Sequence, residues 1–182
     1  MLPVGHAKLI DNWDVLGLRA TGSIDYQIDD VFVPEGYTHF AGTQTPKRGG
    51  PLFTIGVIGF AILCHSGWAC GIGRRLLNEL SAKVRGGVGR SGSMASSEAF
   101  QERYAKAEAT FRSARALIFE GWSDVEESFK RGVPLTTRQN TLVRLAMANA
   151  TWACHEVSEF VYASAGTVAL RAGTLQRLFR DM

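Results

Sequence analysis

The side chains that could do chemistry in this sequence are few, and they form no hydrolytic constellation. The four histidines, His6, His39, His65 and His155, have no Ser or Cys nucleophile signature that matches them. The glycine-rich stretch 86–89 follows a predicted helix, whereas a phosphate-binding glycine loop follows a strand. The residues alone therefore assign no catalytic constellation to this chain.

Three cysteines, Cys64, Cys70 and Cys154, include no Cys-x-x-Cys pair. Cys64 and Cys154 each precede a histidine, but such pairs chelate poorly because adjacent residues on a helix point about 100° apart. We therefore expect no metal site. We interpret the cysteines as reduced thiols in the core of a cytoplasmic protein, and the N-terminal residues do not resemble a signal peptide.

The composition is that of a globular chain with a real core. Of its 182 residues, 46% are hydrophobic, and the formal net charge is only +3. Because there is no block of basic residues, we expect no nucleic-acid partner.

The elements that must position any site begin with a strand. Residues 13–23 form a turn-rich segment with apolar anchors, and apolar and polar residues then alternate over residues 24–28. This two-residue period predicts a half-buried strand. The apolar face shifts by one residue near Asp30, which predicts a bulge, and Pro34 ends the strand.

Three long helices are predicted after the strand. The first runs from near Phe53 to Val84, and the third starts near Thr137 and stops at Gly166. The second is capped by Ser97 and ends at Gly132. Its apolar seam, with steps of three and four, consists of Phe100, Tyr104, Ala107, Phe111, Ala114, Ile118, Trp122, Val125 and Phe129. The apolar face assigned to the third helix consists of Leu142, Leu145, Ala148, Trp152 and Phe160.

The first helix is apolar enough to require a membrane check. No charged residue lies between Arg48 and Arg74, a span long enough to cross a bilayer. The glycines within it and the amphipathic helices after it favour a central helix that is buried on all sides. The glycines, including the Gly67/Gly71 pair, then mark close approach of helices.

Two segments resemble one family closely. Residues 13–23, "WDVLGLRATGS", and 29–35, "DDVFVPE", resemble the end of the middle β-domain of the acyl-CoA dehydrogenase superfamily. The sequence of these two segments is most similar to the branch of two-component flavin monooxygenases that includes p-hydroxyphenylacetate hydroxylase and dibenzothiophene monooxygenase. The resemblance continues to residues 177–181, which match an "R-x-x-R-D" turn, and so covers nearly the whole chain.

The resemblance implies a flavin, as FAD or FMN, whose phosphates reach the helical domain of a neighbouring subunit. The family's arginine contact, "R-x-x-F-G", is not intact here, and Arg85 and Arg90 are the candidates. The second contact, "Q-x-x-G-G", becomes residues 162–167, with Gly166 and Thr167 as candidates. The loss of its Gln and first Gly is typical of the monooxygenase branch, in which a flavin reductase delivers loosely held reduced flavin.

The resemblance further implies that no catalytic residue lies within this chain, because the family's base follows the "R-D" turn and would lie beyond Met182. We interpret Glu156 as a paired or solvated carboxylate rather than as a base. Arg177, Arg180 and Asp181 are expected to form an ion-pair clasp.

These observations predict a mainly α fold, an up-down helical bundle preceded by a few strands from an incomplete β-domain. We expect a β-domain remnant at 1–40, a linker at 41–51, and at 52–182 a helical domain that lacks its last helix. Its uncovered groove predicts self-association, in the family typically as a homotetramer.

The predicted function is that of the C-terminal portion of a flavin-dependent oxidoreductase, a reduced-flavin-dependent monooxygenase of an aromatic or sulfur compound. Acyl-CoA dehydrogenation is the alternative within the family. A helical oligomerisation module without flavin chemistry, and a membrane-associated helical protein, are alternatives of other classes. We expect the chain alone to turn over no acyl-CoA or phenol and to bind flavin weakly at best.

Overall fold

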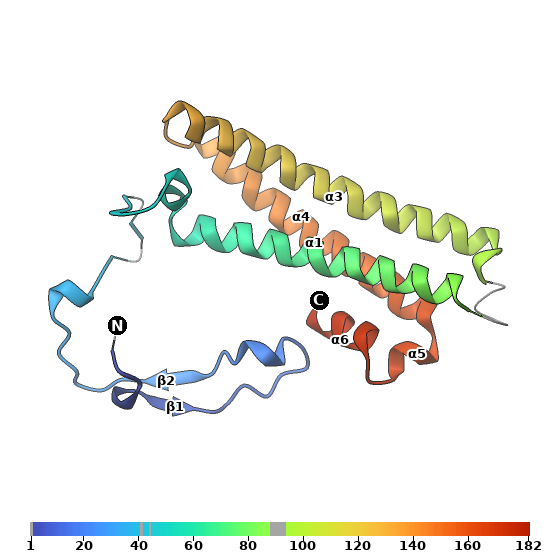
Figure 1. Cartoon of the computed structure of the whole chain (residues 1–182), viewed down its shortest axis with the longest axis horizontal. Coiled ribbons are helices and arrows are strands. Elements are labelled where there is room, and N and C mark those ends of the chain that lie inside the picture. Colours follow the sequence, from blue (N-terminus) through green and yellow to red (C-terminus); the bar gives the residue numbers. More distant parts are fainter. Residues whose placement is uncertain (1, 41, 44, 88–93) are drawn as a thin grey trace.

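The computed structural model describes residues 2–40, 42–43, 45–87 and 94–182. A two-stranded sheet lies beside a bundle of three long helices, and the last helices pack below the end of the bundle (Figure 1). The elements are β1 (Lys8–Ile10), β2 (Asp25–Gln27), α1 (Gly56–Arg85), α3 (Glu98–Arg131), α4 (Thr137–Ala165), α5 (Thr167–Leu170) and α6 (Thr174–Asp181). A 3-10 turn, Pro51–Ile55, leads into α1. The predicted fold class, a mainly α up-down bundle preceded by strands, is confirmed.

The sheet is shorter and more exposed than the sequence predicted. β1 and β2 pair antiparallel, with Lys8 opposite Gln27 and Ile10 opposite Asp25, and every residue of both strands is exposed. The prediction of a half-buried strand is therefore wrong, because no other described segment covers either face. Asp30 has a positive φ of 45°, but it lies in the loop after β2 and not in a bulge of the ladder.

The core lies where α4 packs along its length against both α1 and α3. These helices alternate in direction along the chain (Figure 1). All seam residues predicted for α3 are buried or half-buried, and its bounds are within a residue of those predicted. Gly132 ends the helix with φ 65°, and its N–H and that of Val133 donate to the Phe129 and Ser128 carbonyls. Ser97 occupies the N-cap position, although its side chain makes no capping hydrogen bond within the described structure.

The turn between α3 and α4 is held by Gln139. The Thr136 hydroxyl accepts from the Gln139 N–H, and the Gln139 side chain accepts from the Thr136 N–H, which forms a capping box. The Gln139 amide also donates to the Ser128 hydroxyl at 2.8 Å and to the Asp124 carbonyl at 3.0 Å. These bonds satisfy a buried amide and fix the start of α4 against the end of α3.

The apolar face predicted for α4 is largely wrong. Leu145 is 58% exposed and Trp152 is 71% exposed, whereas Phe160 is half-buried. The side chains that α4 buries are smaller, and they include Val143, Ala146, Ala150, Cys154, Val157 and Val161. Small side chains let α4 approach two helices at once, so the larger apolar side chains on the opposite side do not reach the core.

α1 buries one face and not its whole circumference. Ile62, Leu76 and Leu80 are buried, whereas Val57 and Phe60 near its start are more than half exposed. The prediction of burial on all sides is wrong for this helix. By length and composition alone, the segment 51–85 could cross a membrane, and 28% of its most apolar window is buried in the described structure.

A backbone contact joins the segment before β2 to the end of the chain. The Leu18 N–H donates to the Asp181 carboxylate at 2.7 Å. A side chain at Gly17 would collide with the Arg180 carbonyl, so only glycine permits this approach. The expected ion pair among residues 177–181 is wrong for the described structure, because Asp181 accepts from a backbone N–H instead.

The glycines of α1 differ in the space around them. A Cβ at Gly73 would lie 2.6 Å from the Cys154 sulfur and 3.1 Å from the Phe111 ring, whereas a Cβ at Gly67 or Gly71 has no described atom within 4 Å. The expectation of close helix approach therefore holds at Gly73 and is wrong at Gly67 and Gly71.

These surroundings predict opposite effects of the same substitution. Gly73→Ala should lower the free energy of unfolding by about 1–3 kcal/mol, because the added methyl overpacks the contact of three helices. Gly71→Ala should raise it by about 0.5–1 kcal/mol, because alanine favours the helix and meets nothing. Urea unfolding of both variants measures the difference, and changes of the same sign would contradict the packing described here.

Candidate functional site

A pocket of about 550 Å³ lies at one end of the bundle, where α1 and α4 end and α3 begins. The alternating direction of the three helices brings these termini together (Figure 1). Gly166 and Thr167, two of the predicted cofactor contacts, both line this pocket. Its walls carry two cationic side chains, three hydroxyls and several apolar side chains, namely Lys83, Arg103, Ser97, Ser164, Thr167, Met94, Phe100 and Val168.

The donors in this pocket fit a phosphate group. Arg103 and Lys83 supply basic side chains that can donate to phosphate oxygens, and hydroxyls can donate to the remaining ones. Arg103 lies over the Phe160 ring, 5.3 Å from Cζ to the ring centroid, and this cation–π contact holds the guanidinium beside the pocket. The apolar wall suits the flat part of a nucleotide better than it suits an inorganic ion.

The chain turns sharply where α4 ends. Gly166 has φ 60°, in a region that other residues rarely adopt, and it ends the helix as predicted. Ala165, in place of a family glycine, is 3% exposed and belongs to the core. Tyr162, in place of the family's Gln, stacks on Phe179 of α6 with ring centroids 4.0 Å apart. The position of the family's Gln therefore serves packing between α4 and α6 in this chain.

Arg85 lies in a different depression. It is the last residue of α1, it is exposed, and it lines a shallow surface hollow of about 480 Å³ with Arg74, Tyr104 and Glu108. The structure thus brings Gly166 and Thr167 together but does not place Arg85 in their pocket. Arg90 lies outside the described residues.

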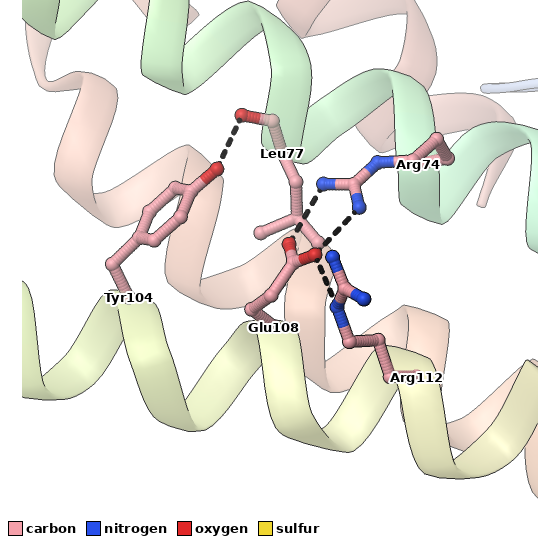
Figure 2. A network of polar contacts seen from close by, with 5 residues as sticks. All are labelled: Arg74, Leu77, Tyr104, Glu108 and Arg112. Atoms are coloured by element: carbon pink, nitrogen blue, oxygen red, sulfur yellow. Dashed lines mark hydrogen bonds and ion pairs between the residues drawn. The ribbon is translucent and has the colours of Figure 1, made fainter.

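The hollow is built on an ion-pair network between α1 and α3 (Figure 2). The two terminal nitrogens of Arg74 donate to the two oxygens of Glu108 at 2.8 Å each, and the Arg112 Nε donates to the same carboxylate at 2.8 Å. The Tyr104 hydroxyl donates to the Leu77 carbonyl at 3.2 Å. Arg74 also lies over the Phe111 ring, so its guanidinium is held by the Glu108 carboxylate and by the ring.

Hydrogen bonding sets the protonation of this network. The hydrogen bond from Arg74 lowers the pKa of Glu108 below its ordinary value, and the same bond raises the pKa of Arg74. The carboxylate and guanidinium therefore remain charged at neutral pH and act as a structural pair.

The cysteines lie in three different environments. Cys64 is exposed, Cys70 is half-buried and Cys154 is buried, so the prediction of core thiols is wrong for Cys64. Burial raises the pKa of Cys154 to about 12, which leaves that thiol protonated and unreactive. Within the described ranges, no group of three or more His, Cys, Asp or Glu side chains could hold a metal ion.

Two other hollows lie near the start of α1. One, of about 470 Å³, is lined by the α3–α4 turn and the residues before α1, and the other, of about 310 Å³, is lined mainly by apolar side chains of residues 43–60. Their described linings carry no charged side chain, so they do not fit a phosphate as the pocket at Gly166 does.

Sequence reasoning missed Lys83 and Arg103 as pocket residues. The signal was present in the predicted topology. In an up-down bundle the first and third helices end where the second begins. A cation in the first turns of the second helix, three residues after Phe100, therefore lies beside the segment that ends the third.

Comparison with known proteins identifies the family. A sequence model of the family described as "Acyl-CoA dehydrogenase, C-terminal domain" matches residues 63–182. The chain belongs to this family. The predicted resemblance to the acyl-CoA dehydrogenase superfamily is therefore confirmed.

The relatives with curated names are monooxygenases and a hydroxylase. An indole-3-acetate monooxygenase of Pseudomonas putida is 34% identical over 160 residues, which are 87% of this chain and 41% of the relative. An indole-3-acetate monooxygenase of Acinetobacter baumannii and a pigment production hydroxylase of Rhodococcus erythropolis are each 26% identical, over 93% and 94% of this chain and 44% and 46% of the relatives. The chain thus spans less than half the length of these relatives.

Two solved structures have the same fold. The 3-HSA hydroxylase from Rhodococcus sp. RHA1 matches with a TM-score of 0.76 at 22% identity, over 99% of this chain and 49% of that one. The HsaA monooxygenase from M. tuberculosis matches with a TM-score of 0.79 at 21% identity, over 99% and 48%. Both matches include the sheet as well as the bundle.

The network in Figure 2 predicts a dependence of stability on pH. Because the folded-state pKa of Glu108 is lowered, its contribution is fully present above the ordinary value of 4.5 and is lost as the pH falls through the lowered value. Glu108→Gln should destabilise the fold by about 1–2 kcal/mol at pH 7 and remove this part of the pH dependence. Denaturant unfolding between pH 7 and pH 3 measures it.

Glu120→Gln is the matched control, because Glu120 is an exposed carboxylate of α3 without an ion pair in the described structure. If both variants lose stability equally at every pH, the network does not contribute as argued.

Proposed function

We propose that this chain is part of a reduced-flavin-dependent monooxygenase that acts on an aromatic compound. The observation that carries the proposal is the 34% identity to an indole-3-acetate monooxygenase over 87% of the chain. The substitutions at the second flavin contact support it further, since Tyr162 stacks on Phe179 and is taken up by packing. Weak binding at this contact fits a flavin that binds in its reduced form and dissociates in its oxidised form.

In this proposal the pocket at Gly166 holds the phosphate end of the flavin, as FAD or FMN. Lys83, Arg103 and the Thr167 hydroxyl bind the phosphate oxygens, and Phe100 and Val168 exclude water from its apolar side. The electrons that activate molecular oxygen would come from the bound reduced flavin. This chain's own part is binding and orientation, and we assign no catalytic residue to it.

The proposed partners follow from the same reading. A flavin reductase supplies the reduced cofactor, and copies of the chain associate, as a tetramer in the complete protein. The exposed apolar side chains on α1 and α4 support association, because large exposed apolar patches mark contact surfaces. We place the protein in the cytoplasm, where reduced pyridine nucleotide is available to a reductase and thiols stay reduced.

A domain exchange tests the proposed activity. The region of the Pseudomonas putida relative that this chain matches is replaced by this chain, and the chimera is assayed with a flavin reductase, NADH, oxygen and indole-3-acetate. We expect reductase-dependent oxygenation of the aromatic acid. Arg103→Ala in the chimera should lower kcat/KM at least about tenfold, because one charge-assisted phosphate contact is lost.

Arg131→Ala is the charge-matched control at the opposite end of α3, and it should leave kcat/KM unchanged. Far-UV circular dichroism and thermal unfolding establish that each chimera is folded. A folded chimera that oxidises an acyl-CoA instead of the aromatic acid would contradict the proposal, and equal activity of both variants would contradict the role of Arg103.

A further inference from the structure

The surface of α4 opposite the core carries a mostly exposed stripe. We call it the α4 back face. Its residues recur with alternating steps of three and four, and they are Arg138, Thr141, Leu145, Ala148, Trp152, His155 and Glu159. Positions seven apart lie on one stripe of a helix, so this spacing is that of a helix-pairing seam.

The centre of the α4 back face is apolar and exposed. Trp152 is 71% exposed and Leu145 is 58% exposed, and Ala148 between them is exposed as well. A tryptophan that is exposed to this degree in the middle of a long, well-packed helix is unusual for a surface that meets only water.

The two ends of the α4 back face carry opposite charges. The side chain of Arg138, near the start of the helix, is 79% exposed, and that of Glu159, near its end, is 64% exposed. Each has one partner within the chain, since Asp124 lies 3.7 Å from Arg138 and His155 lies 3.7 Å from Glu159. Because both side chains remain mostly exposed, each charge can also meet a partner from outside.

We infer that the α4 back face pairs with the same face of a second copy of this chain, antiparallel and about a two-fold axis. The axis lies between Ala148 and Asn149, which is the midpoint both of Leu145 with Trp152 and of Arg138 with Glu159. Leu145 then packs against the partner subunit's Trp152, and Arg138 meets the partner subunit's Glu159.

The pattern selects a second copy and this orientation. One axis satisfies the apolar pair and the charged pair together, as an isologous interface requires. A parallel pair would place Arg138 against Arg138 and Glu159 against Glu159, which repel. The inference rests on the self-association proposed above, but it does not depend on flavin chemistry.

Sedimentation velocity of the purified chain tests the face. Trp152→Glu should raise the dissociation constant for self-association at least about tenfold, because it removes the central apolar anchor. Phe119→Glu is the matched control, since Phe119 is an exposed aromatic of α3 that lies outside the stripe, and it should have no such effect. Equal weakening by both variants, or by neither, would overturn the assignment.

Charge exchange tests the orientation. Arg138→Glu and Glu159→Arg should each weaken association, and the double variant should restore it, because every charged pair across an antiparallel interface is then opposite again. Failure of the double variant to restore association would overturn the antiparallel register. Circular dichroism of each variant establishes that helix content is unchanged.

A cysteine crosslink locates the axis. In a Cys64→Ser background, Ala148→Cys should form a covalent dimer under mild oxidation, because two copies of this position face each other across the axis. Ala116→Cys, at an exposed site on α3, should not. A wild-type chain that stays monomeric at about 50 µM would overturn both this interface and the proposed self-association, whereas an oligomer without the crosslink would overturn the interface alone.

Discussion

The close contact of three helices at Gly73, Cys154 and Phe111 is the constraint on which the rest of this structure depends. A methyl group at Gly73 would meet the Cys154 sulfur at 2.6 Å, so α1 and α4 pack with no room for a side chain at this position. Because α4 presents small side chains to both neighbours, one helix can serve as the common partner of the other two.

Two surfaces result from the same packing. At one end, the termini of α1, α3 and α4 converge around the pocket that Gly166 and Arg103 line. Along its outer side, α4 exposes Leu145 and Trp152, because the side chains that it buries completely are mostly small. The α4 back face is thus a consequence of the small residues that α4 places in the core.

The helices and their ends could be predicted from the sequence, because caps and breakers act locally. Gly132 and Gly166 end their helices where expected. The face that α4 buries could not be predicted by counting large apolar residues, since close packing on two sides selects alanine and cysteine over Trp152. The exposure of the strand could not be predicted either, because a two-residue period shows which side chains a strand could bury and not whether another element covers them.

The pocket shows the same division. Gly166 and Thr167 were found from a family motif, whereas Arg103 becomes a neighbour of this motif only through the packing of the helices.

The central claim is that the pocket binds the phosphate end of a flavin nucleotide. Amide chemical shifts recorded by NMR during titration with FMN and FAD test it most directly. The account predicts salt-sensitive shifts at Ser164, Thr167 and Val168, and shifts confined to the hollow at Arg74 and Arg85 would contradict it.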